Sequence, residues 1–394
     1  MTYKELFTNY KIIRQISLLQ FVAYFGAWFT NVAIYSMLIE FKATSFMIAL
    51  VAAMHLFPAV ILAPFSGSIV DRFDLKKLML ILLTIELSMT LCFGFINSLE
   101  DIWMLLIFLF IRMGSASIFF TTEMTLMPQL IPEEVLVKAN EVHSIIWSFT
   151  FTAGVALGGL IVDLFGIKIS FLIDGAFFFT AIILLTQINF NLKPKKITIS
   201  ISKSIKEGIL YLKDNRYIFH FMFLHASVGF IAFDTIITLL ANYSYKYIIS
   251  VPLAIGLTNS TRAFALMIGP LFISKWVNKQ NLFYIFIIQG STIILWAFLQ
   301  DKFYFGLFGI FLTGITTTTL WSFTYAVLQE HIKKRYLGRI LAYNEMFFML
   351  TTVLTTLFIG IMTSYISLTS ITSILGFAFI ITAYYYRNIL SKER

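Results

Sequence analysis

Charged residues inside long apolar stretches of the sequence include Glu86, Arg112, Asp174, Asp234 and Arg262. Charges at bilayer depth are costly, and they usually mark substrate paths, proton relays or ion pairs. At a rise of about 1.5 Å per residue, Glu86 and Arg112 fall near the middle of their stretches, where their opposite charges allow them to pair. Arg262 also falls near the middle, and Asp174 lies in the outer third. Asp234 lies in the outer half, either on a transport path or as the partner of Arg262.

Long apolar segments must position these charges. Only 12% of the 394 residues are charged, against about 25% in soluble domains, and stretches of roughly 20 apolar residues recur throughout. We predict an all-α integral membrane protein with twelve transmembrane helices. They cover residues 15–39, 45–69, 78–97, 102–124, 140–163, 168–190, 217–241, 251–275, 281–299, 303–328, 340–362 and 367–388. The first is too long for a cleaved signal peptide, so we expect it to be retained.

Most basic residues outside these stretches fall in connections on one side of the membrane. Only Lys42, Lys168, Lys246 and Lys302 fall in odd-numbered connections, whereas the termini and even-numbered connections hold all the others. The positive-inside rule therefore predicts cytoplasmic termini in a multi-pass protein of the cell membrane, expected to be a bacterial cytoplasmic membrane. The net charge of +9 follows from this topology, and no nucleic-acid partner is expected.

The chain divides into two six-helix pseudo-repeats. A polar segment separates them, which gives an N-terminal half at 1–190, a cytoplasmic linker with a short amphipathic helix at 191–216, and a C-terminal half at 217–394. Two segments about 200 residues apart, "QLIPEEVLVKANE" (129–141) and "QEHIKKRYLGRILAYNE" (329–345), both begin with Gln and end in Asn-Glu. Such weak internal similarity is typical of transporters built by duplication.

The sequence lacks the residues that several kinds of chemistry require. Cys92 is the only cysteine, and no His-x-x-x-His pair or acidic cluster offers a metal site. The phosphate-binding pattern Gly-x-x-x-x-Gly-Lys is absent, so ATP hydrolysis is not the expected energy source. We therefore predict no enzyme activity, metal or cofactor.

A polar island, "GSIVDRFDLKKLM" (67–79), separates the second and third stretches. It resembles the Gly-x-x-x-Asp-Arg signature of the major facilitator superfamily, and its Asp-Arg-Phe-Asp resembles the macrolide and siderophore efflux branch. "MPQLIPEEVLVKAN", "GVALGGLIVDLFG", "SFLIDGAFFF", "KEGILYLK" and "LGRILAYN" resemble the same branch in the same order. Two positions depart from it: Ala27 stands where many relatives have Asp, and Val155 stands where the exporter motif has Pro.

The resemblance implies a cavity lined by helices one, four, seven and ten. On that map Asn31, Arg112 and Asp234 face the transport path, while Glu86 and Asp174 brace helices. Because Ala27 removes the acid of helix one, Asp234 becomes the first candidate for proton coupling, and Glu86 the second. The alternative for Arg112 is a structural ion pair.

The island also implies a conformational latch. Gly67 permits close helix packing, and Asp71, beside Arg72, can accept hydrogen bonds from the amide end of helix eleven near Arg339. In the alternative interpretation, Arg72 merely obeys the positive-inside rule.

Three glycines of the fifth stretch, Gly154, Gly158 and Gly159, have the spacing that lets helices pack closely. They serve either simple helix packing or a dedicated exporter role.

These features predict a monomeric secondary active exporter of an amphipathic or aromatic small molecule, driven by proton antiport. Its partners would be the substrate, protons and membrane lipid. One alternative is a lipid or lysophospholipid translocase of the same fold. Another is a membrane sensor that transports nothing, because Ala27 and Val155 erode two family positions.

Overall fold

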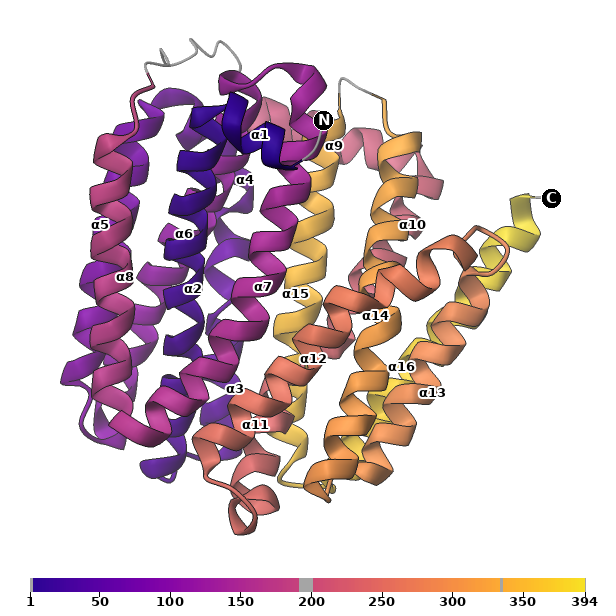
Figure 1. The fold of residues 1–394 in the computed structure, drawn as a ribbon. Coiled ribbons are helices and arrows are strands. Elements are labelled where there is room, and N and C mark those ends of the chain that lie inside the picture. Colours follow the sequence, from indigo (N-terminus) through magenta and orange to yellow (C-terminus); the bar gives the residue numbers. More distant parts are fainter. Residues whose placement is uncertain (1–2, 191–200, 334–335, 394) are drawn as a thin grey trace. The chain divides into compact units, whose positions relative to one another are not determined.

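The computed structural model describes residues 3–190, 201–333 and 336–393, and the regular elements in that part of the chain are helices (Figure 1). Twelve helical segments there are long and apolar enough to cross a membrane. The α-helices are α1 (Tyr3–Asn9), α2 (Lys11–Glu40), α3 (Ser45–Met54), α4 (Phe57–Arg72), α5 (Leu75–Cys92), α6 (Ile102–Leu130), α7 (Glu133–Phe165), α8 (Ile167–Gln187), α9 (Ile201–Asp214), α10 (Arg216–Ser227), α11 (Asp234–Tyr243), α12 (Val251–Ile273), α13 (Leu282–Leu299), α14 (Phe303–His331), α15 (Leu337–Met362) and α16 (Leu368–Glu393). The all-α fold predicted from hydropathy is confirmed.

The chain forms two compact units. The N-terminal unit holds residues 1–42 and 65–198, and the C-terminal unit holds 43–64 and 199–394. This division differs from the expected halves at 1–190 and 217–394, because residues 43–64 belong to the C-terminal unit, where α3 packs on α15 and α11. Gly360 of α15 lies directly against Ala49 of α3, a close approach that a larger residue would prevent.

Packing inside each unit joins helices that are distant in sequence. In the N-terminal unit α2 packs against α7 and α8, and α5 packs against α6 and α8. In the C-terminal unit α13 lies beside α16 and α12 beside α14 (Figure 1). The buried charges of each unit are therefore enclosed by helices of that unit.

Local sequence signals set two helix starts. Thr44 caps α3 by accepting a hydrogen bond from the Met47 amide, and Asp74 caps α5 by accepting one from the Lys77 amide at 2.9 Å. The second aspartate of the polar island is thus a helix cap. The turn from α7 to α8 needs φ of +81° at residue 166, which is a glycine.

The seventh membrane segment is broken, although a continuous helix over 217–241 was expected. It runs as α10, then a 3₁₀ turn at Val228–Ile231, then α11 from Asp234. Gly229 in that turn packs so tightly on α15 that an added Cβ would lie 2.8 Å from the Thr352 hydroxyl and 2.9 Å from the Phe348 carbonyl. The break places Asp234 in the first turn of α11, where the helix dipole favours a carboxylate.

The short linker helix is present as α9. Within the C-terminal unit, its Glu207 accepts a hydrogen bond from the Arg339 guanidinium at 3.0 Å, and its Tyr211 ring stacks on Tyr336 at 4.4 Å. The linker residues 191–200 lie outside the described part of the chain.

Candidate transport site

A buried ion pair lies inside the N-terminal unit. Nη2 of Arg112 on α6 donates to Oδ2 of Asp174 on α8 at 2.8 Å, and their side chains are only 2% and 0% exposed. The Thr30 hydroxyl on α2 donates to the same carboxylate, and the rings of Phe93 and Phe178 lie beside the guanidinium. Three helices therefore converge on one charge pair. Asn31, the neighbour of Thr30, is half-buried on α2.

This pairing corrects the expected partner of Arg112, because the guanidinium binds Asp174 and not Glu86. The structural ion pair, the alternative for Arg112, is the arrangement found. Glu86 is buried on α5, 5% exposed, and still lies close enough to interact electrostatically with Arg112, Asp174 and Glu123. It is thus an additional carboxyl group near the pair.

Glu123 is a buried acid that sequence reasoning missed. It lies on α6, is fully buried, and accepts a hydrogen bond from the Tyr24 hydroxyl on α2. The ring of His143 meets the Tyr24 ring edge-on at 6.0 Å. A signal existed, because Glu123 follows Arg112 by eleven residues, which is three helical turns and hence the same face.

Asp234 and Arg262 face each other in the C-terminal unit. Their nearest oxygen and nitrogen are 3.5 Å apart, and the side chains are 46% and 13% exposed. The Arg262 guanidinium also lies over the Phe233 ring at 5.7 Å. The pair is looser and more accessible than Arg112–Asp174, so a smaller change is needed to separate it.

The residues expected to form the latch are only partly described. Gly67 and the side chain of Asp71 lie outside the described part of the structure, and Arg72 at the end of α4 is exposed. Arg339 pairs with Glu207 of the linker helix. The linker helix is therefore a partner of Arg339 that the sequence did not reveal.

Two of the three glycines in α7 contact α2. A Cβ on Gly154 would lie 2.8 Å from the Trp28 Cβ, and one on Gly158 would lie 3.0 Å from the Phe29 Cα. Gly159 is also buried. Small residues here let α2 and α7 approach closely.

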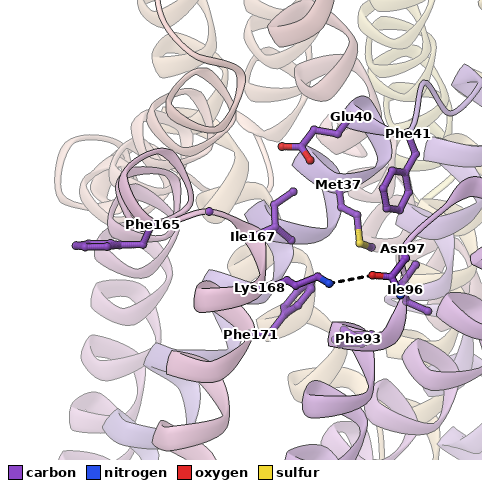
Figure 2. Close-up of a pocket in the computed structure, with 11 residues that line it drawn as sticks. Met37, Glu40, Phe41, Phe93, Ile96, Asn97, Phe165, Ile167, Lys168 and Phe171 are labelled. Atoms are coloured by element: carbon purple, nitrogen blue, oxygen red, sulfur yellow. Dashed lines mark hydrogen bonds between the residues drawn. The ribbon is translucent and has the colours of Figure 1, made fainter.

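A cavity of about 350 Å³ opens at one end of the N-terminal unit (Figure 2). It lies between the end of α2, the α5–α6 connection and the α7–α8 turn. Lys168 donates to the Asn97 side chain at 2.9 Å on one side, and the Glu40 carboxylate lies on the other. Phe93, Phe165 and Phe171 add aromatic walls. The cavity thus combines one charge of each sign with apolar surface, and none of the residues expected to carry transport lines it.

Membrane-spanning helices in two units, with charges buried at depth, define a polytopic membrane transporter. The family model of the Major Facilitator Superfamily matches residues 16–300, and the chain belongs to this superfamily. The protein is therefore a transporter of that superfamily and not an enzyme.

Curated relatives come from bacteria. The chain is 30% identical over 217 residues to the uncharacterized MFS-type transporter YfiS of Bacillus subtilis, a match that covers 53% of this chain and 51%, about half, of that relative. It is 23% identical to macrolide efflux protein A of Streptococcus pyogenes over 79% of each chain. It is 24% identical to macrolide efflux protein A of Enterococcus faecalis, over 75% of this chain and 94% of the relative.

Solved structures of low identity share the fold. The nucleoside transporter NupG superposes with a TM-score of 0.72 at 15% identity, over 96% of this chain and 99% of NupG. A bacterial homologue of the iron transporter ferroportin, in an inward-facing state, gives 0.70 at 16% identity over 97% and 98%.

Proposed function

We propose that this chain is a secondary active exporter of an amphipathic or aromatic small molecule, working by alternating access with proton antiport. The macrolide efflux relatives support the efflux direction and the substrate class. The cavity that combines Glu40, Lys168 and phenyl rings also suits amphipathic molecules. The proposal includes a monomer in the bacterial cytoplasmic membrane with both termini in the cytoplasm.

The observation that carries proton coupling is the accessible pair of Asp234 and Arg262 at the break in the seventh membrane segment. Broken membrane helices in transporters expose backbone dipoles and carry binding sites. Asp234 is close enough to Arg262 for attraction and exposed enough for protons to reach it. If the arginine moves toward a substrate, the carboxylate loses its counter-charge, and this is the change that the proposed coupling requires.

Asp234→Asn is expected to abolish uptake against a gradient into inside-out vesicles while leaving substrate exchange at zero gradient largely intact. The amide keeps the size of the side chain but cannot carry the proton. Uptake of a labelled macrolide or siderophore, with and without an imposed pH gradient, measures this. Asp163→Asn, which changes an exposed acid of α7, serves as the matched control. Full pH-driven accumulation by the Asp234 variant would show that another acid binds the coupling proton.

The same vesicles distinguish the alternative functions. Flux of a fluorescent lysolipid without drug flux would identify a lipid translocase. Absence of any substrate-dependent flux, together with binding of a partner protein, would identify a sensor. Either result replaces the exporter proposal.

We also propose the latch at Asp71, which the sequence motif supports. Asp71→Asn is expected to weaken transport with little change in the amount of folded protein, because the residue biases one conformation instead of building the core. Labelling of cysteines introduced on the cytoplasmic side should increase in the variant. Unchanged labelling together with unchanged transport would remove the latch from the mechanism.

A further inference from the structure

A histidine and a glutamate meet inside the C-terminal unit, away from the Asp234–Arg262 pair. His225 on α10 is fully buried, and its Nδ1 lies 2.9 Å from the Thr324 hydroxyl oxygen on α14. Its Nε2 lies 3.6 Å from Oε1 of Glu345 on α15, whose side chain is 29% exposed. Three helices of the unit thus contribute one polar group each.

The hydrogen bonds of Thr324 determine which ring nitrogen carries hydrogen. The Thr324 hydroxyl donates its only hydrogen to backbone carbonyls of its own helix, to Leu320 at 2.8 Å or to Trp321 at 3.1 Å. Toward His225 the hydroxyl oxygen can therefore only accept. With the Thr324 hydrogen on its own helix, Nδ1 is the donor, and a neutral His225 then has no hydrogen on Nε2.

The atoms facing each other across the gap are then two acceptors. An unprotonated Nε2 faces a carboxylate oxygen, and neither His225 Nε2 nor Glu345 Oε1 has a hydrogen-bond partner among the described residues. Buried acceptors without a hydrogen-bond partner destabilise the fold. One added proton between them gives both atoms a hydrogen-bond partner. The result is either an imidazolium beside a carboxylate or a carboxylic acid that donates to the ring.

No other charged group among the described residues around His225 is placed to bind the proton at the Nε2–Oε1 gap. Trp321, Tyr325 and Phe348 surround the imidazole with ring centroids 5.3–5.7 Å away. Of these only Tyr325 is titratable, and it interacts electrostatically with Glu345.

Two titratable groups of other elements packed on α10 have partners elsewhere. Tyr385 of α16 pairs with His220, and Glu207 of α9 pairs with Arg339. The turn at Val228–Ile231 has no titratable side chain. The proton at the gap therefore belongs to His225 and Glu345.

We propose that His225 and Glu345 form a proton-binding site that takes up one proton from water at the Nε2–Oε1 gap. One N–H or O–H bond forms at the site as an O–H bond of a hydronium ion breaks and a water molecule is left. The bound proton joins α10 to α15, and its loss leaves two acceptors in opposition and loosens that contact. With the proposed antiport as its basis, this site is a second position in the C-terminal unit where a proton binds. Its occupancy changes the packing of α10 against α15.

Glu345→Gln tests the site directly, because a glutamine amide can donate to Nε2 without any added proton. Nitrogen NMR of ¹⁵N-histidine-labelled protein reports hydrogen on each ring nitrogen, and loss of a signal in His225→Gln assigns His225. In the wild type, Nδ1 should stay protonated and Nε2 should exchange a proton within about pH 5–8. In Glu345→Gln, Nε2 should remain an unprotonated acceptor throughout. His220→Gln, on the same helix, is the control that leaves these signals unchanged.

Thermal unfolding provides an independent measurement should Glu345→Gln fail to fold. If the folded site holds this proton more tightly than an unfolded histidine, whose pKa is about 6.5, the site stabilises the fold more as pH falls toward that value and no more below it. The melting temperature of the wild type relative to His225→Gln should therefore rise as pH falls from about 8 to about 6.5 and then level off. A flat difference, hydrogen missing from Nδ1, or wild-type titration in Glu345→Gln would overturn the proposal.

These readouts do not require transport. Absence of pH-driven accumulation by the wild type would refute the antiport proposal, while the NMR result would still decide whether the proton site exists. With antiport present, Glu345→Gln should reduce pH-driven accumulation and His220→Gln should not.

Discussion

Arg112→Ala is expected to deplete folded protein sharply and to abolish both pH-driven accumulation and substrate exchange. The substitution leaves Asp174 without its guanidinium partner at a fully buried position, with Glu86 nearby. Removing one partner of a buried pair costs about 3–5 kcal/mol because the other charge stays uncompensated. Such a cost is a large part of the stability of a typical protein. Yield of detergent-stable monodisperse protein and its melting temperature measure the loss.

Two variants separate charge imbalance from loss of a transport residue. Arg112→Met combined with Asp174→Leu removes both charges and should recover much of the folded protein, because apolar replacements of buried pairs are often tolerated. Arg262→Ala is the matched single substitution at the more exposed pair and should cost less stability. Equal losses for Arg112→Ala and the double variant would show that the ion pair is not what limits folding.

Gly269→Ala is expected to destabilise the C-terminal unit, although alanine favours helices. An added Cβ on this residue of α12 would meet the Ile315 backbone of α14, with its carbonyl carbon at 2.8 Å and its Cα at 2.9 Å. Backbone atoms cannot rotate away, so α12 and α14 must separate. Overpacking of this kind costs about 1–3 kcal/mol. The melting temperature of the purified variant measures it.

Gly338→Ala is the control for helix propensity. Gly338 lies in the first turn of α15, and a Cβ there would meet nothing within 4 Å. Replacing a helical glycine by alanine in open space stabilises by roughly 0.5–1 kcal/mol. The two substitutions should therefore shift the melting temperature in opposite directions. Stabilisation by both substitutions would show that α12 and α14 are not in close contact.

Secondary structure and membrane character followed from the sequence because both depend on local composition. Hydrophobic length alone located the membrane-spanning helices, and "DRFD" with its companion motifs indicated the superfamily. The break in the seventh segment was not predicted. Gly229 is its only local signal, whereas the close contact with the α15 backbone that requires a glycine there exists only in the folded unit.

The sequence by itself determined which charges lie at membrane depth, because depth depends only on distance along a helix. It did not determine their partners. Each residue turns the side chain by about 100° around the helix axis, and helix rotation and neighbours are set by packing. Only the tertiary structure therefore paired Arg112 with Asp174 instead of Glu86, and it brought His225 to Glu345 across 120 positions of sequence. Contacts between distant helices decide which buried charges are neutralised and which remain available for a proton.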